Sequence, residues 1–271
     1  MKKKWSGERL ETFIYSRDTI EHLHRYAVTF DFIKDKNVLD IASGEGYGSH
    51  LMSKVAATVS GVDIDCESVK NANKKYKKDN LLFERGSVTQ IPFNDDLFDV
   101  VVSFETIEHL EEHDTMISEI KRVLKKDGIL IISTPDKKNY TDLRNFKNKF
   151  HVKELYKAEF ENLLKNYFNY CNLYQQLYLN GISVIFPDKA QTKMNDNIFL
   201  GDYNNVIKTS SLPLYLVAVV SNNTLNKVET SFFDGSSIII KEAFAIFQMS
   251  NSYIVGNFIL KPLKIIKRIL K

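Results

Sequence analysis

The segment VLDIASGEGYGS, residues 38–49, constrains this chain more than any other feature of its sequence. A short apolar run ends in a loop with three glycines, Gly44, Gly46 and Gly48, and a helical pattern follows. Glycine adopts backbone conformations that other residues avoid, and it lets a ligand approach the backbone closely. A glycine loop between a strand and a helix N-terminus is typical of nucleoside-binding α/β domains.

Two acidic residues accompany this loop. Asp40 precedes the first glycine, and we expect it to accept hydrogen bonds from the N–H groups of the loop. Asp63 ends the next apolar run, where an acid is positioned to bind ribose hydroxyls. The order of strand, loop, helix, strand and terminal acid predicts a nucleoside cofactor. A tight turn with a helix-capping acid is the alternative.

The spacing of the loop separates two classes of cofactor. Dinucleotide sites use GxGxxG, whereas this loop is GxGxG, and Ser49 stands where the last glycine of the dinucleotide pattern would fall. Glu45 within the loop would also repel a pyrophosphate. S-adenosylmethionine (SAM) carries no phosphate, so the spacing favours SAM over NAD.

The rest of the chain predicts a parallel sheet covered by helices on both faces, because short β-branched runs alternate with amphipathic runs. We expect strands at residues 37–42, 58–64, 81–85, 98–104, 128–134, 171–178 and 213–221. We expect helices at residues 20–33, 47–54, 66–77, 114–126 and 153–167. In the first helix the residues expected to face the core are Leu23, Ala27, Phe30 and Ile33.

This pattern predicts three parts. Residues 1–36 form an N-terminal helical cap, residues 37–221 a SAM-binding domain with an irregular insertion at 183–211, and residues 222–271 a C-terminal extension. From residue 262 onward apolar and basic residues separate onto two faces, which is typical of a helix on a membrane surface. Docking of this tail on the protein's own core is the alternative.

The charge, the cysteines and the N-terminal residues indicate which partners and which cellular location to expect for this protein. A net charge of +3 is too small to predict a nucleic-acid partner. Cys66 and Cys171 match no metal-ligand or redox spacing, and the N-terminal lysines precede polar residues rather than the apolar run of a secretory signal. We therefore expect a cytoplasmic protein that contacts the inner face of the membrane through its tail.

The sequence resembles the class I SAM-dependent methyltransferases. VLDIASGEGYGS is similar to their first motif, and GVDID is similar to the acidic motif of their second strand. IPFNDDLFDVVVSFETIEHLE and LKKDGILIISTP resemble the segments around their fourth and fifth strands. The resemblance implies a doubly wound α/β sandwich of three layers. Its seven-stranded, mostly parallel sheet would have the order 3-2-1-4-5-7-6, with strand 7 antiparallel.

The resemblance also implies how SAM would be bound. Asp63 would bind the ribose hydroxyls, and Ser87 would replace an Asp that is common in relatives beside the adenine amino group. Arg25 would pair with the methionine carboxylate, or else would be a solvated surface residue. The complete set of residues predicted to bind or support SAM is Arg25, Asp40, Ala42, Gly44, Gly46, Asp63, Ile64, Ser87, Val88, Phe104 and Glu105.

A narrower resemblance concerns the acceptor. HLHRYAV, GEGYGS and NFKNKFHVKELYKAEFENLL are similar to segments of methyltransferases from bacterial O-antigen and capsule pathways. This likeness implies O-methylation of a sugar or sugar phosphate, with a glycan or a nucleotide sugar as acceptor. The alternatives are a methyltransferase for a quinone or another small molecule, and a SAM-binding scaffold subunit without catalysis.

Two histidines are candidates for the base that an alcohol acceptor needs. His109 follows the fourth strand, and His151 opens the helix after the fifth; each could instead shape its loop. Glu108 is expected to be a solvated acid or to orient either imidazole. Only Asp136 and Asn139 resemble the ligands of metal-dependent O-methyltransferases, so we expect no metal site. The other histidines are expected at the surface: His22, His24, His50 and His113.

Overall fold

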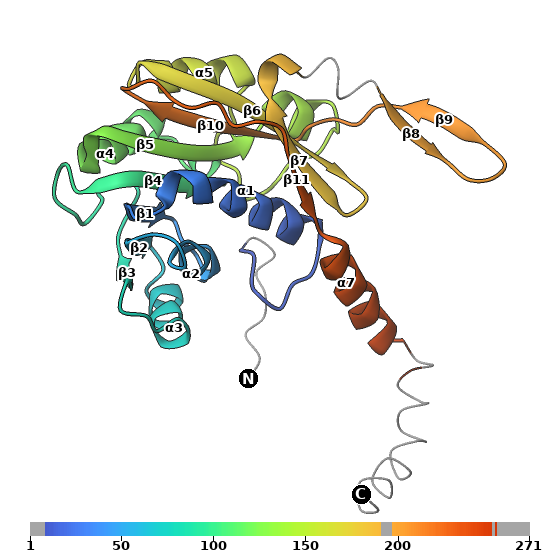
Figure 1. Cartoon of the computed structure of the whole chain (residues 1–271), viewed down its shortest axis with the longest axis horizontal. Helices are drawn as coiled ribbons and strands as arrows, with labels where there is room; N and C mark the ends of the chain where they lie inside the picture. The colour runs from blue at the N-terminus through green and yellow to red at the C-terminus, as the bar shows by residue number, and fades with distance from the viewer. Residues whose placement is uncertain (1–8, 191–196, 251–252, 254–271) are drawn as a thin grey trace, which may run out of the picture.

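A nine-stranded sheet forms the centre of the computed structural model, which describes residues 9–190, 197–250 and 253 (Figure 1). The strands from β1 to β5 are parallel to one another, and β10 runs antiparallel between β5 and β6. The order across the sheet is β11-β7-β6-β10-β5-β4-β1-β2-β3. The strands are β1 Asn37–Ile41, β2 Thr58–Asp63, β3 Leu81–Arg85, β4 Phe98–Phe104, β5 Leu124–Pro135, β6 Tyr170–Leu179, β7 Ile182–Pro187, β10 Tyr215–Ser221 and β11 Ser231–Asp234.

This order confirms the predicted fold class, because β10 occupies the place of the antiparallel strand 7 between β5 and β6. The predicted count of seven strands is wrong. β7 pairs with β6, and β11 pairs with β7, so two further strands widen one edge of the sheet. The sheet therefore extends past residue 221, where the sequence had suggested the end of the domain.

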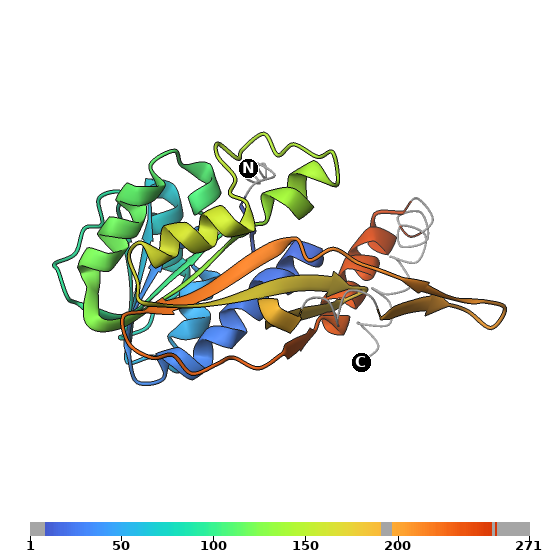
Figure 2. The same cartoon turned by 90° about the horizontal axis from the view of Figure 1, so that it is seen from above.

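Helices cover both faces of the sheet (Figure 2). Successive residues of β4 divide between the two cores, since side chains alternate across a strand. Val101 packs in the core beneath α4 and α5, whereas Val100 and Val102 pack in the core beneath the other helices. The helices are α1 Arg17–Ile33, α2 Tyr47–Met52 and α3 Cys66–Lys75 on one face, and α4 His113–Val123 and α5 Lys157–Lys165 on the other.

The described residues of the insertion predicted at 183–211 are largely regular, whereas the sequence had suggested an irregular segment. The insertion contains most of β7, the one-turn helix η3 Asp188–Ala190 and the hairpin of β8 Ile198–Gly201 with β9 Val206–Thr209. The hairpin projects from the body of the molecule (Figure 1). The later helix α7 Ser236–Gln248 follows β11, and the basic tail predicted from residue 262 lies outside the described residues. No helix in the described part of the chain is long and apolar enough to span a membrane.

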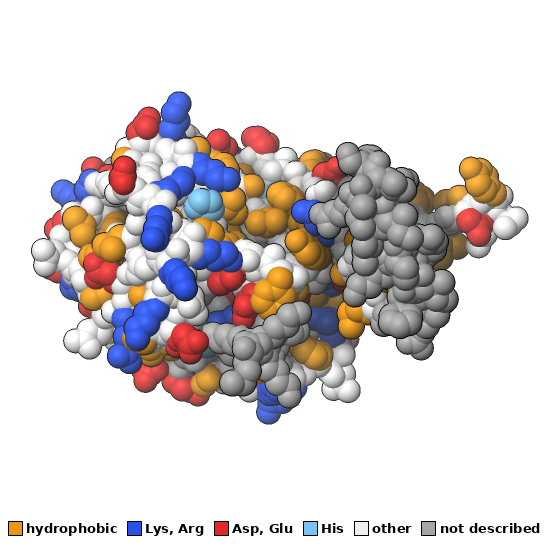
Figure 3. Space-filling model, turned by 90° about the horizontal axis from the view of Figure 1, so that it is seen from below, with side chains coloured by type: hydrophobic (Ala, Val, Ile, Leu, Met, Phe, Trp, Pro, Cys, Tyr) orange, Lys and Arg blue, Asp and Glu red, His pale blue; other side chains and the backbone are white. Residues whose placement is uncertain are grey.

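The exposed side of α3 is rich in lysine, as expected for an amphipathic helix whose other side packs on a sheet. Figure 3, which views the molecule from below, shows Lys and Arg side chains spread among acidic ones over the left part of this face. On α3 itself the exposed lysines are Lys70, Lys74 and Lys75.

The buried side of α1 is polar, which the hydrophobic pattern did not predict. Leu23 and Phe30 are only half-buried, whereas Glu21, His24 and Arg25 are buried. The two ring nitrogens of His24 lie 2.9 Å and 3.0 Å from the hydroxyls of Ser183 and Ser231. Burial and the nearby Arg25 charge lower the pKa of His24 to about 4. The prediction that His24 lies at the surface is therefore wrong, and the same holds for His113, which is also buried.

The helix predicted at residues 153–167 is present as α5 but is shorter than expected. A π-helical turn, η2 Lys138–Asp142, follows β5, and α5 begins only at Lys157. His151 therefore lies in the loop before α5 rather than at the start of the helix.

Truncation of Ile120 tests the packing of α4 on the sheet. Ile120 is fully buried in the core formed with β4, β5 and α5. We expect Ile120→Ala to lower the free energy of unfolding by about 2–5 kcal/mol, because it leaves a cavity in a packed core. Urea denaturation measures the change. Ser118→Ala, at an exposed position of the same helix, is the control, and equal stability of the two variants would contradict this packing.

Candidate active site

A cavity of about 840 Å³ lies at the carboxyl ends of β1, β2 and β4, beside the N-terminal segment and the loop after η2. Ligands of open α/β sheets bind at this edge, because the loops that follow parallel strands meet there. The predicted residues that line the cavity are Ala42, Gly44, Asp63, Ile64, Ser87, Val88, Phe104, Glu105, His109 and His151. The predicted residues Arg25, Asp40 and Gly46 do not line it.

The glycine loop opens its backbone toward the cavity. Gly44 has φ +55°, in the left-handed region that favours glycine, and no atom lies within 4 Å of the position that a Cβ would take. Gly46 has φ +85°, and a Cβ there would lie 2.6 Å from a ring carbon of Phe83. Gly44 therefore leaves room for a ligand, whereas Gly46 allows α2 to pack against β3.

Asp63 braces the loop, a role that the sequence analysis had given to Asp40. Its Oδ2 accepts a hydrogen bond of 2.9 Å from the Gly44 N–H. Its Oδ1 accepts hydrogen bonds from the Asp65 N–H at 2.8 Å and from the Arg9 guanidinium at 3.2 Å. An ionised carboxylate offers about four lone-pair positions. Asp63 thus keeps limited capacity for ribose hydroxyls while it holds the loop.

Asp40 lies below the loop and fixes the start of α2. It accepts hydrogen bonds from the Ser49 hydroxyl at 2.6 Å and from the Tyr26 hydroxyl at 3.3 Å. Burial raises the pKa of Asp40 to about 7. Asp40 therefore supports the cofactor loop from inside the protein.

Arg25 is buried, so the reading of this residue as a solvated surface arginine is wrong. Its guanidinium donates a hydrogen bond of 2.7 Å to the Gln176 side chain and lies 3.9 Å from a carboxylate oxygen of Glu105. It also lies over the Tyr215 ring, 4.8 Å from the centroid. Arg25 does not line the cavity, whereas its neighbour Glu105 does. Pairing of Arg25 with the methionine carboxylate therefore stays a prediction.

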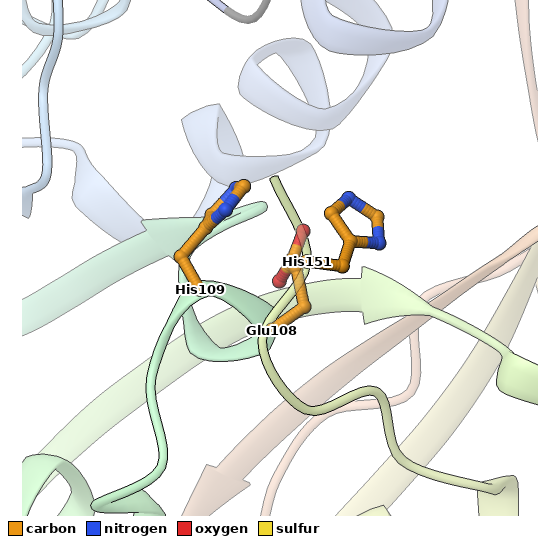
Figure 4. Close-up of side chains that lie close together, drawn as sticks. All are labelled: Glu108, His109 and His151. Atoms are coloured by element: carbon orange, nitrogen blue, oxygen red, sulfur yellow. The ribbon is translucent and has the colours of Figure 1, made fainter. Parts of the chain in front are cut away.

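Glu108, His109 and His151 form a cluster at the opposite wall of the cavity, where the Glu108 carboxylate rises between the two imidazole rings (Figure 4). The cluster joins segments far apart in the sequence. The carbonyl oxygen of Glu108 accepts hydrogen bonds from the N–H groups of Val152 and Lys153, at 2.8 Å and 3.0 Å. These two bonds hold the loop of His151 against the one-turn helix η1 Ile107–His109.

Glu108 is buried, so the expectation of a solvated acid is wrong. One oxygen, Oε2, accepts a hydrogen bond of 3.2 Å from the Thr134 hydroxyl. The other, Oε1, has no hydrogen-bond partner within the described part of the chain. Burial and the neighbouring charge of Glu105 raise the pKa of Glu108 above its usual range.

Both imidazoles are oriented through Nδ1. The Nδ1 of His109 lies 2.9 Å from the carbonyl oxygen of Phe150, which can only accept, so this nitrogen carries the proton. The Nδ1 of His151 lies 2.5 Å from a carboxylate oxygen of Glu154, and its Nε2 lies 2.9 Å from the amide nitrogen of Asn148. The rings are 5.2 Å apart between centroids and nearly perpendicular.

The loop after η2 adds lining residues that the sequence analysis did not single out. Lys147 and Lys149 are exposed and line the cavity together with the rings of Tyr140, Phe146 and Phe150. In the segment NFKNKF two phenylalanines flank two lysines, and this grouping of aromatic and basic residues was the available signal. The site thus combines a nucleoside-binding end with a cationic, aromatic end.

Comparison with known proteins finds similarity to methyltransferases. Residues 39–132 match the family described as "Methyltransferase domain". A protein named "Probable S-adenosylmethionine-dependent methyltransferase" from Mycolicibacterium smegmatis is 36% identical over 131 residues, which are 48% of this chain and 50% of that protein. The ubiquinone biosynthesis O-methyltransferase of Pelagibacter ubique is 32% identical over 106 residues, 39% of this chain and 44% of that protein.

A solved SAM-dependent methyltransferase from Thermotoga maritima has the same fold, with a TM-score of 0.54 and 18% identity over 76% of this chain and 90% of that chain. The chain spans about half the length of the curated relatives that it matches. These matches, with the sheet order and the glycine loop, show that the chain has the fold of the SAM-dependent methyltransferases and that residues 39–132 are similar to a methyltransferase domain, which implies S-adenosylmethionine as the cofactor.

Substitution of Asp63 tests the predicted ribose contact. Hydrogen bonds to a charged acceptor contribute about 1.5–3 kcal/mol each, so we expect Asp63→Ala to weaken SAM binding by about tenfold or more. Titration calorimetry measures the affinity, and circular dichroism checks that the fold persists. Glu67→Ala, an exposed acid at the start of α3, is the matched control. Unchanged SAM affinity in Asp63→Ala would remove the ribose assignment.

Proposed function

We propose that this protein transfers the methyl group of SAM to a hydroxyl of a sugar or sugar phosphate. The observation that carries the proposal is the division of one cavity into two chemically different ends. The glycine loop and Asp63 lie at one end, and the Glu108–His109–His151 cluster lies at the other beside Lys147.

The first end fits SAM. The open space at Gly44 admits polar ligand atoms to the backbone, and Asp63 supplies a carboxylate for hydroxyls. Ile64 is 63% exposed and lines the cavity, so it offers an apolar surface to a flat base. SAM, when bound, supplies an electrophilic methyl group on a sulfonium. The chain must then align the acceptor, exclude water and take up a proton.

The second end can take up that proton. An alcohol hydroxyl needs a base within hydrogen-bond reach, and an imidazole has a suitable pKa near neutral pH. His109 and His151 both line the cavity, and their Nδ1 partners hold the rings in place. We propose that this pair activates the acceptor hydroxyl.

The lysines favour an anionic acceptor. Lys147 and Lys149 place two positive charges at the wall of the cavity, and a phosphate would meet them there. The rings of Tyr140 and Phe146 offer flat surfaces on which a sugar can lie. Both features support a sugar phosphate or a nucleotide sugar as acceptor.

The second candidate acceptor is a quinone precursor or another lipid precursor. The aromatic lining of the cavity suits a flat apolar ring as well, and the relative from Pelagibacter ubique is named for ubiquinone biosynthesis. This candidate needs no contact with the lysines, so the two acceptors are separable by experiment.

An acceptor panel tests the proposed function. Transfer of labelled methyl from SAM is measured with nucleotide sugars, sugar phosphates, short glycans and catechol-type quinone precursors. We expect turnover with a phosphorylated sugar, and Lys147→Gln and Lys149→Gln should raise its KM by about tenfold, since each removes a charge contact of about 1.5–3 kcal/mol. Lys126→Gln, an exposed lysine of β5 outside the cavity, is the control. Turnover of the catechol alone, with KM unchanged in the lysine variants, would favour the second candidate.

Substitution of the histidines tests how the hydroxyl is activated. His109→Ala and His151→Ala should each leave SAM affinity nearly unchanged, because neither contacts the glycine-loop end of the cavity. At least one of them should lower the methyl-transfer rate by about 10²-fold or more, as loss of a general base does. Single-turnover kinetics with the acceptor found above provide the measurement. Normal turnover by both variants would leave the alignment of the reactants as the source of catalysis.

A further inference from the structure

We propose that Glu108, His109 and His151 bind a divalent transition-metal cation in the acceptor end of the cavity. The potential ligand atoms of these three side chains all lie within 4.8 Å of one another, and all three residues line the cavity (Figure 4). This departs from the expectation of the sequence analysis, which looked for Asp and Asn ligands near β4 and β5.

The first argument is the orientation of the imidazoles. A metal-bound histidine typically donates its other ring N–H to a carboxylate or a backbone carbonyl, which fixes the tautomer and makes the ligating nitrogen more basic. His109 does this with the carbonyl of Phe150, and His151 does it with the carboxylate of Glu154. Both rings therefore direct Nε2, the nitrogen that would ligate, away from these Nδ1 partners.

The second argument is the state of Glu108. A buried carboxylate oxygen normally has a hydrogen-bond donor or a cation beside it, because leaving it without one costs free energy. Oε1 of Glu108 is buried and has no hydrogen-bond partner among the described residues, although the side chain is only 1% exposed. A cation beside the two imidazoles would satisfy this oxygen. The unpartnered oxygen is an observation separate from the orientation of the rings, and it points to the same ion.

The ligand set indicates the class of ion. Two imidazole nitrogens and one carboxylate suit Mn²⁺, Fe²⁺, Co²⁺ or Zn²⁺ better than Mg²⁺ or Ca²⁺, which prefer oxygen ligands. Metal–nitrogen distances near 2.1 Å place neighbouring ligands about 3–3.4 Å apart, so side-chain rotations of modest size complete the site. One such rotation moves the Asn148 amide away from Nε2 of His151, which it contacts at 2.9 Å.

The ion would have a chemical use that rests on the proposed function. Three protein ligands leave positions for an acceptor oxygen, and a bound cation lowers the pKa of that hydroxyl. The hydroxyl proton passes to water at the mouth of the cavity. The oxygen then forms a bond to the methyl carbon as the sulfur–methyl bond breaks, and sulfur keeps the electron pair. Under this proposal His109 and His151 would act as ligands, the cation would lower the pKa of the hydroxyl as a Lewis acid, and water would accept the proton.

The full-length protein, freed of metal with a chelator and dialysed, provides the test. Calorimetry with ZnCl₂, MnCl₂ and MgCl₂ measures affinity and stoichiometry, and CoCl₂ gives visible absorption when imidazole coordinates the ion. We expect one Zn²⁺ or Mn²⁺ per chain, with weaker binding of Mg²⁺ and a higher melting temperature in the presence of the tighter ion. Glu108→Gln, His109→Ala and His151→Ala should each weaken binding by at least about tenfold.

Controls separate this inference from the proposed function. His50→Ala removes an imidazole of α2 that does not line the cavity, and its metal affinity should equal that of the unaltered protein. SAM affinity of each variant verifies that the domain is folded. Absence of stoichiometric binding, or binding that the three variants do not weaken, overturns the metal site. Full methyl transfer by the chelator-treated protein also overturns the catalytic use of the ion, while it leaves the proposed function intact. Stoichiometric metal binding without turnover of any acceptor would support the metal site and contradict the proposed function.

Discussion

The buried guanidinium of Arg25 is the constraint on which the arrangement of the site depends. A charge removed from water must be paired, and loss of one partner of such a pair is strongly destabilising. Arg25 meets this requirement with Gln176 of β6, Glu105 after β4 and the ring of Tyr215 in β10. These contacts dock α1 across the carboxyl edge of the sheet, so the helix that precedes the first strand becomes a wall of the site.

Glu105 shows how this constraint reaches the cavity. Its backbone has φ +50°, a conformation that few non-glycine residues adopt, and its carboxylate accepts a hydrogen bond of 2.6 Å from Ser133 of β5. The strained residue is held by β5 on one side and by Arg25 on the other. Such an unfavourable backbone conformation persists only where several surrounding contacts hold it in place, which is common at functional sites. The turn after Glu105 then presents Glu108 and His109 to the opposite wall.

The sequence predicted the parts of the site that are encoded locally. The glycine loop and the acid Asp63 follow from short motifs and from strand and helix periodicity. The order β3-β2-β1-β4-β5 was implied by the resemblance to a known family, and the fold confirms it. It could not predict the burial of Glu108, because this depends on the chain returning after β5 to donate hydrogen bonds from Val152 and Lys153. The polar face of α1 was missed for the same reason, since Arg25 and His24 find their partners on strands far along the chain.

Arg9 binds the same carboxylate, Asp63, that is predicted to bind the ribose of the cofactor. Neither the sequence motif nor the fold would suggest this competition. The Arg9 guanidinium binds Asp63 at 3.2 Å and Asp65 at 2.8 Å, and the neighbouring Leu10 also lines the cavity. Oδ1 of Asp63 already accepts two hydrogen bonds, so its lone pairs are occupied, whereas Oδ2 accepts one. A ribose that binds through two hydroxyls must therefore displace one of these donors. The Arg9 guanidinium is the one that can leave without opening the glycine loop, because the other two donors are backbone N–H groups of the loop and of the start of α3. Ribose binding at Asp63 would thereby be linked to the position of the N-terminal segment through a single carboxylate.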